Sequence, residues 1–453
     1  MKNTRWTLVI LFLLIISVFG SFDVQATPGE INLSRAVSQP WRHISSYSGD
    51  NIDMLGSNEG WSVLNAGTRA FLYHWNGTTW QKWGEISHSQ DIVRSDIEII
   101  SETDGWITLG GPLGQEAETS IYRWNGTNWI LFDILTDPNQ ISMGRLSMIS
   151  ATDGWALANF GFGSFLYHWN GTTWNKEQTI WLSENFIDRD IHMVSSTDGW
   201  AIGDSIYRFD GTNWTELDGL PTIDHSLYAI DMVSANDGWI VGEEGTIMHW
   251  DGTSWTSVSS PTTIVLTAIS MASADHGWAI GGEYSGSNVL IHWDGSSWTE
   301  VDCPTDAELK DIFMISEYDG WFTSGWSSTS PSGIFRYDPT SLEINHTSGA
   351  VGSYLNVTGE GFPPNATTTI NVNDDVLSTS LSTDLSGTIQ FTLDTNSADL
   401  GVYYVSVSVN PKSTARFVLS SDEPEHPLEG SFTLLEIPAG IALQEVYLPL
   451  IIN

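Results

Sequence analysis

Residues 227–258 read "LYAIDMVSANDGWIVGEEGTIMHWDGTSWTSV", and this stretch decides the fold because versions of it recur along the chain. Its Gly-Trp pair returns at intervals of 39 to 49 residues, with the tryptophans at Trp61, Trp106, Trp155, Trp200, Trp239, Trp278 and Trp321. A self-similarity of this period is typical of repeat architectures. The sequence therefore predicts seven structural units of one kind.

Each unit contains four short β-rich stretches. In the quoted copy they are 227–233, 239–241, 246–250 and 255–258, which we name strands a, b, c and d. Clusters of Gly, Asp, Asn and Ser separate them and mark turns. Four strands in about 43 residues, repeated radially, are typical of a β-propeller blade. We predict an all-β fold containing a seven-bladed β-propeller.

The two ends of the array indicate how the ring closes. Residues 40–57 align with residues 254–273, so Trp41 is the counterpart of Trp255 at the start of strand d. A strand d thus precedes the first strand a. The last copy ends in Asp338-Pro339-Thr340 where other copies have Asn-Gly or Asp-Gly, and proline cannot adopt the positive φ of glycine in a tight turn. We predict that residues 41–44 pair with strand c of the seventh blade.

The remaining segments suggest further domains. Residues 341–420 are rich in Thr, Ser and Val and lack tryptophan. Their alternating stretches, with Gly-x-x-Gly and Gly-x-Gly-Phe-x-Pro, resemble the small immunoglobulin-like domains of bacterial exported proteins, which implies a β-sandwich. Residues 421–453 are predicted to be a linker and C-terminal tail. The propeller domain is assigned to residues 27–340.

The N-terminus has the layout of a secretory signal. Lys2 and Arg5 precede an apolar run over residues 8–19, and Val24-Gln25-Ala26 follows. We expect residues 1–26 to be cleaved and the mature chain to be secreted or on the cell surface, an uncleaved anchor being the alternative. No later run is long enough for a membrane span. Cys303 is the only cysteine, so no intramolecular disulfide is expected.

The net charge limits the classes of partner that the chain is expected to bind. The chain has 16 Lys+Arg against 55 Asp+Glu, a formal charge of -39. Such a charge repels nucleic acids and anionic lipids and favours a soluble monomer. We expect no cofactor, because no His/Cys/Asp spacing typical of a metal site occurs. The middle residue of strand a is polar in six of seven copies and is predicted to line a hydrated channel: Asp53, Glu98, Ser147, His192, Asp231, Ser270 and Phe313.

The candidate binding residues lie near one predicted face. The a–b and c–d turns are short and uniform, whereas the b–c and d–a loops on the opposite face vary, and function tends to sit on irregular loops. Aromatic side chains outside the repeat positions are suited to stacking on sugars or to binding a protein partner. The arginines just before strand a are suited to binding a carboxylate. The predicted ligand-binding residues are Trp83, Trp181, Trp326, Phe160, Tyr284, Arg94, Arg145 and Arg189. In the alternative interpretation, the rings pack into loop cores and the arginines pair with Asp96, Asp188 and Asp190.

The unit also resembles known repeats. Residues 198–217, "DGWAIGDSIYRFDGTNWTEL", are similar to the Asp-box or sialidase-type repeat and to exported propellers related to photosystem II assembly factors. The matching residues are Asp-Gly-Trp-x-x-Gly, Ile-Tyr and Asp-Gly-Thr-x-Trp, and the resemblance covers residues 41–338. It implies that the turn aspartates between strands c and d, such as Asp210 and Asp251, are structural. The Asn-x-Thr sequons of earlier copies, such as Asn76, fall on this turn and are interpreted as turn residues too.

The resemblance leaves catalysis weakly supported. A sialidase would require three arginines, a Tyr/Glu nucleophile pair and an acid aspartate, and only candidate arginines are found. We therefore predict an exported, non-catalytic binding or scaffolding protein that recognises a glycan or an extracellular protein through the variable-loop face. A sialidase-like glycoside hydrolase is the alternative.

Overall fold

The computed structural model describes residues 40–443 except 114–117, 137–140, 161–162, 182–189, 204, 222–224, 283–286, 374 and 409–412. The predicted signal peptide and residues 444–453 lie outside this part of the chain. Within the described residues no helix has the length and apolar character needed to cross a membrane.

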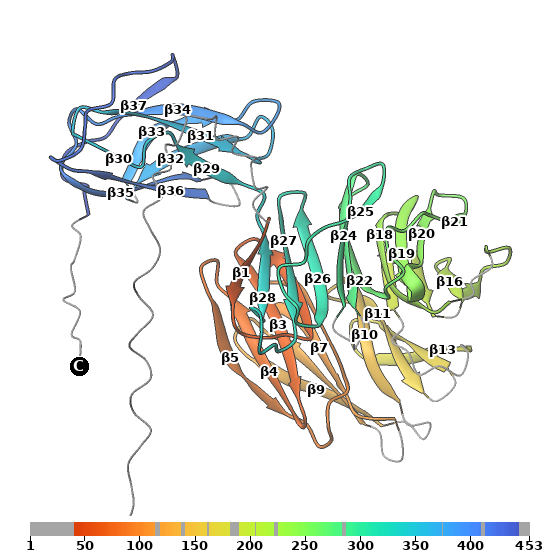
Figure 1. Cartoon of the computed structure of the whole chain (residues 1–453). Helices are drawn as coiled ribbons and strands as arrows, with labels where there is room; N and C mark the ends of the chain where they lie inside the picture. The colour runs from red at the N-terminus through yellow and green to blue at the C-terminus, as the bar shows by residue number, and fades with distance from the viewer. Residues whose placement is uncertain are drawn as a thin grey trace, which may run out of the picture. The chain divides into compact units, whose positions relative to one another are not determined.

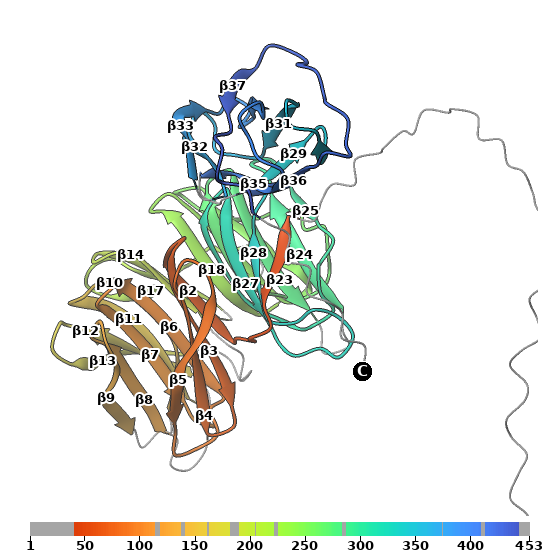
Figure 2. The ribbon, with the colours of Figure 1, turned by 90° about the vertical axis from the view of Figure 1, so that its left-hand side faces the viewer.

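Seven four-stranded antiparallel sheets form the blades, and in blades 1 to 6 the strands run from the inside outward in chain order (Figures 1 and 2). Blade 1 is β2 (Asn51–Gly56), β3 (Glu59–Ala66), β4 (Arg69–Trp75) and β5 (Trp80–Ser87); blade 2 is β6 (Arg94–Ser101), β7 (Asp104–Gly110), β8 (Glu118–Trp124) and β9 (Trp129–Thr136). Blade 3 is β10 (Ser142–Ser150), β11 (Asp153–Phe160), β12 (Gly163–Trp169) and β13 (Trp174–Trp181); blade 4 is β14 (Asp190–Ser195), β15 (Asp198–Ile202), β16 (Ile206–Phe209) and β17 (Trp214–Glu216). Blade 5 is β18 (Leu227–Ser234), β19 (Asp237–Gly242), β20 (Ile247–Trp250) and β21 (Trp255–Ser257), with a 3-10 turn at Glu243–Gly245; blade 6 is β22 (Leu266–Ser273), β23 (His276–Gly282), β24 (Asn288–Trp293) and β25 (Trp298–Glu300).

Blade 7 combines both ends of the array. It consists of β26 (Leu309–Ser316), β27 (Asp319–Ser324) and β28 (Ile334–Tyr337), and its outer strand is the N-terminal β1 (Trp41–Ser45). Trp41 pairs with Tyr337 in this antiparallel ladder. Figure 1 shows β1 beside β28, at the junction between blade 7 and blade 1. The predicted seven-bladed propeller and its closure by an N-terminal strand are confirmed.

Tryptophans join each blade to the next. The Gly-Trp indole of one blade lies between the ring that ends strand c and the ring that begins strand d of the following blade. Trp200, which is fully buried, lies 4.8 Å from Trp250 and 5.3 Å from Trp255 between ring centroids. Blade 7 contacts blade 1 in the same way, through Trp321 and Trp75 at 4.9 Å. The repeated tryptophans therefore form the blade-to-blade core, as expected for large apolar rings.

The glycine before each of these tryptophans is required by close packing. A Cβ atom placed on Gly238 would lie 2.2 Å from the sulfur of Met232 in strand β18. Met193 and Met314 approach Gly199 and Gly320 equally closely. Because no side chain fits there, glycine occurs at this position in every blade.

A polar pair covers the outer side of the Gly-Trp indole in most blades. In blade 5, Asp237 accepts a hydrogen bond from the His249 ring at 2.8 Å, and that ring lies 4.3 Å from Trp239. In blade 4 Arg208 takes the place of the histidine, at 3.0 Å from Asp198. Blade 6 differs, because His276 occupies the position of the acid and faces His292 at 4.6 Å between ring centroids. Burial lowers the pKa of His276 to about 4, so this pair is neutral near pH 7.

Replacing His276→Asp is expected to stabilise the propeller. In the wild-type blade 6, His276 Nδ1 and His292 Nε2 have no hydrogen-bond partner among the described residues. The substitution would give His292 the carboxylate partner that His249 has in blade 5. A hydrogen bond to a charged group contributes about 1.5 to 3 kcal/mol. Urea denaturation at pH 7 measures the gain. The reciprocal control, Asp237→His, should lose stability; equal midpoints for the three proteins would contradict the prediction.

The turn between strands c and d has the predicted chemistry. In blade 1 the Asn76 side-chain oxygen accepts hydrogen bonds from the N–H groups of Thr78 and Thr79, both at 3.0 Å. Asp251 does the same in blade 5, and the following glycine, Gly252, has a φ of 88°. Asn and Asp are thus interchangeable as turn residues here.

The C-terminal region contains two further sheets. One has the order β29 (Ser341–Ile344), β31 (Tyr354–Glu360), β34 (Ile389–Asp394) and β37 (Thr433–Glu436); the other has the order β30 (Ser348–Gly349), β36 (Ser413–Leu419), β35 (Gly401–Ser408), β32 (Thr367–Val372) and β33 (Asp375–Ser382). Side chains from both sheets, including Phe391 and Tyr403, share one core. The region is a β-sandwich with mixed sheets, since β30 with β36 and β34 with β37 pair in parallel.

One predicted segment differs from the structure. Residues 421–453 were expected to be linker and tail, but β37 lies within them and hydrogen-bonds with β34. Leu435 and Ile437 are buried in the sandwich core. The apolar side chains of this short stretch belong to the second domain. The sequence did not indicate this, because residues 422–425, three acids and a proline, are typical of a linker.

Candidate functional site

The two faces of the propeller differ as predicted. On one face the short turns meet: the Trp75 indole, at a c–d turn, donates a hydrogen bond to the carbonyl of Ser57 in an a–b turn at 2.9 Å. On the other face, the loop that joins strand d of blade 6 to strand a of blade 7 contacts the b–c loop of blade 7. The Thr305 hydroxyl in the first loop donates a hydrogen bond to the Pro331 carbonyl in the second at 2.5 Å. We call this second surface the loop face.

Trp326 is the prominent aromatic residue of the loop face. It lies in the b–c loop of blade 7, residues 325–333, and 79% of its surface is exposed, the largest fraction among the exposed tryptophans of the described residues. No ring contact covers it in the described part of the chain. The sequence placed this residue correctly on the loop face, and its binding role stays a prediction.

Asp306 fixes the loop that carries Trp326. Its carboxylate accepts hydrogen bonds from three hydroxyl groups of that loop, those of Ser327 at 2.6 Å, Thr329 and Ser330. These bonds hold the pKa of Asp306 down at about 2, so it is ionised at any physiological pH. The loop base is closed by Gly325, whose N–H donates to the Glu308 carbonyl at 2.8 Å. Trp326 is therefore presented by a preorganised loop.

The other predicted aromatic residues are placed differently. Trp83 was expected on the loop face, but it lies within the outer strand β5, where it packs edge-on against Trp61 at 5.7 Å and Trp124 at 5.8 Å. Phe160 stacks on Phe165 at 4.3 Å, in agreement with packing into a loop core. For Trp181, the described backbone places it at the end of β13, opposite Gly163. Tyr284 lies outside the described residues.

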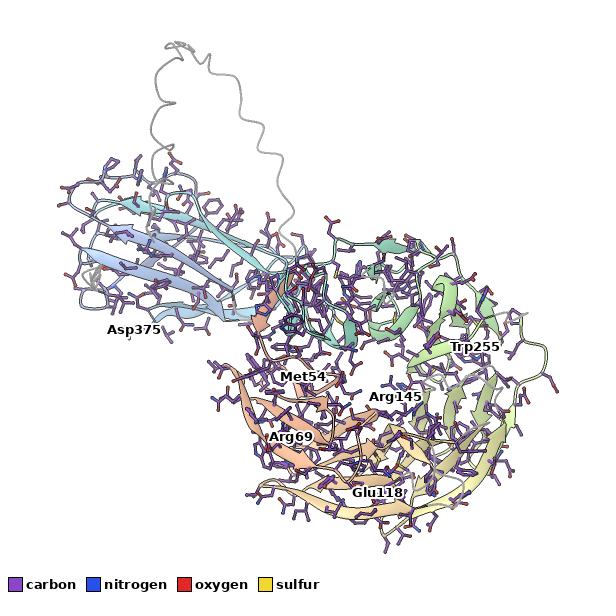
Figure 3. All side chains as sticks on the ribbon, turned by 60° about the horizontal axis from the view of Figure 1, so that its bottom comes forward. Met54, Arg69, Glu118, Arg145, Trp255 and Asp375 are labelled. Carbon is purple, nitrogen blue, oxygen red and sulfur yellow. The ribbon has the colours of Figure 1, made fainter. Side chains whose placement is uncertain are left out.

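Two of the three predicted arginines, Arg94 and Arg145, lie within the described residues, and their role in ligand binding stays a prediction. Arg145, on the innermost strand β10, lies 3.9 Å from Asp96 and 3.8 Å from Asp190. Figure 3 shows Arg145 on the inner side of the ring of blades. The side chain of Arg94 runs past Gly144, where a Cβ would approach its Cδ to 3.0 Å. Arg189 lies outside the described residues. The carboxylates beside Arg145 support the alternative interpretation, in which the arginine pairs with neighbouring aspartates.

The polar residues of strand a connect the blades. In five blades the middle side chain accepts a hydrogen bond from the main-chain N–H of the next blade's strand a. Ser147 accepts from Met193 at 2.8 Å and Ser270 from Met314 at 2.9 Å, and the acids at this position do the same: Asp53 from Ile99, Glu98 from Met148 and Asp231 from Met271. These residues are therefore interblade hydrogen-bond acceptors, a role that the prediction of a hydrated lining missed.

A second layer repeats this arrangement two residues earlier in the strand. Asp96, Asp190 and Asp311 accept from the main-chain N–H groups of Leu146, Ile230 and Ile52 in the following blades, at 2.7, 3.0 and 2.9 Å. Burial raises the pKa of both Asp53 and Asp96 to about 7, and that of Asp311 to about 6, while Arg145 opposes the shift in Asp96 and Asp311. Removing carboxylates from water disfavours their ionised form.

This acidic core gives no indication of a metal site. Among the described residues, no group of three or more His, Cys, Asp or Glu is arranged to hold a metal ion. Each carboxylate named above already accepts a main-chain hydrogen bond. The pKa values of Asp53, Asp96 and Asp311 are thus raised because these carboxylates are buried where they accept hydrogen bonds from the next blade.

Comparisons with known proteins concern the architecture. No protein-family model matches the chain, and no curated protein matches it in sequence. Similar solved structures include YCF48 bound to D1 peptide, with 15% identity, 66% of this chain and 97% of that chain covered and a TM-score of 0.49. YCF48 from Cyanidioschyzon merolae has 14% identity, 66% and 98% coverage and a TM-score of 0.49. The WD40 β-propeller domain of Doa1 has 10% identity, 65% and 96% coverage and a TM-score of 0.46. The chain resembles these proteins as a β-propeller.

Proposed function

We propose that the protein is an exported, non-catalytic binding module that recognises a protein partner through the loop face, with Trp326 as the anchor. The supporting observation is an indole that is 79% exposed on a loop fixed by Asp306. Tryptophan is enriched among residues that dominate binding energy at interfaces. A loop already held in its bound conformation loses little entropy when the partner docks. Export is proposed from residues 1–26 alone.

A protein partner is favoured over a glycan by the chemistry around Trp326. Sugar recognition combines ring stacking with hydrogen bonds from neighbouring polar side chains. Three of the four hydroxyl groups that follow Trp326, those of Ser327, Thr329 and Ser330, already donate to Asp306, whereas that of the exposed Ser328 does not. Most hydroxyl donors of the loop are therefore already engaged, and the exposed indole is its main feature for recognition.

A sialidase-like activity is not favoured. It would need arginines available for a substrate carboxylate, but Arg145 has two aspartates within 4.0 Å. Glycoside hydrolysis also requires a carboxyl pair flanking a substrate. The buried carboxylates Asp53, Asp96 and Asp311 are instead engaged with main-chain N–H groups.

Replacing Trp326→Ala is expected to weaken partner binding by at least tenfold, because truncation of an anchor residue typically costs 2 kcal/mol or more. The mature chain, residues 27–453, would be screened against a displayed peptide library and a glycan array, and the affinities of the selected ligands measured by calorimetry. Asp306→Asn should give a smaller loss, because it loosens the loop without removing the indole.

The matched control is Trp83→Ala, a tryptophan of the same propeller on an outer strand, which should leave affinity unchanged. Selected peptides that bind wild type and Trp326→Ala equally would contradict the proposal. If the chain bound only glycans, and Trp326→Ala abolished that binding, the proposed site would stand but its ligand would be a glycan and not a protein.

A further inference from the structure

The outer strand of blade 2 exposes an unusual amount of apolar surface. In β9 the exposed fractions are 51% for Ile130, 45% for Leu131, 39% for Phe132 and 43% for Ile134. β9 is the last strand in the sheet order β6-β7-β8-β9, and within the described residues it has no partner on its outer side. Its outward main-chain groups form an open sheet edge.

The other blades carry polar residues at the equivalent positions. Ile130 follows the first tryptophan of strand d and faces Arg123 across the ladder. The corresponding residues of the other six strands d are Arg42, Gln81, Asn175, Thr215, Thr256 and Thr299. At the position of Leu131 they are His43, Lys82, Lys176, Glu216, Ser257 and Glu300. Blade 2 alone is apolar at both positions.

Polar side chains at these positions are the usual protection of a sheet edge. Exposed edges pair readily with other chains unless charges, proline or shortness prevent it. The outer strands of blades 4 to 6 are protected by length, because β17, β21 and β25 have 3 residues each. β5 and β13 have 8 residues, as β9 has, but they carry Lys82 and Lys176. β9 is neither short nor provided with a lysine, and Asp133 is its single charged residue.

Packing contacts within the propeller account for the apolar character of only one of the four exposed residues. Phe132 packs against Trp106 at 5.1 Å and Trp169 at 5.2 Å, as Trp83 packs in blade 1. It occupies the bulge position of the strand, the same as Trp83. Ile130, Leu131 and Ile134 have no comparable ring contact. The two other strands d of eight residues carry polar residues at all three positions, namely Gln81, Lys82 and Glu85 in blade 1 and Asn175, Lys176 and Thr179 in blade 3. The apolar character of Ile130, Leu131 and Ile134 therefore points to a binding role.

We propose that an extended segment of a partner protein pairs with β9 as an added fifth strand of blade 2, with apolar side chains against Ile130, Leu131 and Ile134 and basic residues flanking them. Strand addition of this kind takes affinity from main-chain hydrogen bonds and specificity from alternating side chains. The site lies on a different blade from Trp326 and does not depend on the function proposed for the loop face.

The charges around β9 determine the chemistry of the occupant. Asp133 is exposed within the strand, and Glu118 lies opposite its last residue, Thr136. The one basic residue opposite β9, Arg123, is bound by Asp104 through two hydrogen bonds of 2.7 and 2.9 Å. The edge is therefore apolar with acidic surroundings and favours a partner segment with lysine or arginine. A second copy is disfavoured, because two chains of charge -39 repel each other.

The test uses the mature chain and a display library of seven-residue peptides with lysine fixed at both ends. The edge variant combines Ile130→Thr, Leu131→Lys and Ile134→Thr. Blades 4 to 6 carry threonine at the first position, and blade 3 carries Lys176 and Thr179 at the other two, so the blade should fold. We expect selected peptides to bind the edge variant at least tenfold more weakly than wild type. N-methylation of alternate peptide residues on the bonding edge should abolish binding, because it removes the main-chain donors.

The reciprocal variant, Asn175→Ile with Lys176→Leu in blade 3, is expected to gain peptide binding and provides the matched control. Trp326→Ala should bind these peptides normally, which separates this site from the loop face. Equal binding by wild type and the edge variant, or tolerance of N-methylation, would overturn the proposal. A wild-type dimer in analytical ultracentrifugation that the edge variant abolishes would also overturn it, in favour of a second copy as occupant.

Discussion

Replacing Trp41→Ala is expected to lower the free energy of unfolding of the mature chain by about 3 to 5 kcal/mol, the range for removing a buried tryptophan. Only 2% of the Trp41 side chain is exposed. Its ring lies 4.8 Å from Phe322 and 5.4 Å from Trp278, so the truncation leaves a cavity where blades 6 and 7 meet. Urea denaturation followed by tryptophan fluorescence measures the loss.

Trp83→Ala serves as the control, because 38% of its surface is exposed and less contact area is removed. It should cost clearly less stability than Trp41→Ala. Deleting residues 40–45 should lower stability further, since the ladder between β1 and β28 is lost as well. A Trp41→Ala protein as stable as Trp83→Ala would show that the N-terminal strand contributes little to ring closure.

The second large effect concerns pH and Asp53. The pKa of Asp53 is raised from 3.8 to about 7 by burial, so between pH 4 and pH 7 the folded protein holds a proton that the unfolded chain releases. The free energy of unfolding must therefore fall as the pH rises through this window. Asp53→Asn removes the charge. Each unit of pKa shift corresponds to about 1.4 kcal/mol, so the variant should gain roughly 2 to 4 kcal/mol relative to wild type between pH 4 and pH 8.

The comparison across pH isolates the charge, because the hydrogen bond that asparagine fails to accept costs the same at each pH. Asp96 and Asp311, with pKa values of about 7 and about 6, retain part of the slope in the variant. Asp251→Asn is the control: its pKa is lowered to about 2 by turn hydrogen bonds, so the profile above pH 4 should match wild type. Parallel stability profiles for wild type and Asp53→Asn would contradict the prediction.

Much of the fold was predictable because its signals are local and repeated. The Gly-Trp pair, the Asn/Asp-Gly turn and the early Trp41 each mark a position in one blade, and comparing copies gave the strand order and the ring closure. Residues 433–436 were missed because a single short strand after a charged segment has no second copy to reveal it.

The site was less predictable because it depends on contacts between blades. The sequence shows that strand a carries Asp53, Glu98 and Ser147, but the acceptor role requires the N–H of the next blade to lie within reach. Trp83 looked irregular in the sequence, and only the structure shows that it shares a bulge position with Phe132. A signal for β9 was present in the sequence, since aligning the strands d shows Ile130 and Leu131 among polar residues.

The β1–β28 ladder also sets the order in which the ring can be completed. Arg42 donates a hydrogen bond to the carbonyl of Thr340, 298 residues later in the chain. A chain that emerges from its N-terminus must therefore keep β1 without its ladder partner until the seventh blade has been delivered. Contacts of such sequence separation slow folding. We therefore expect the ring to close only after residue 337 has been synthesised, and a chain truncated before residue 334 to leave β1 without its ladder partner.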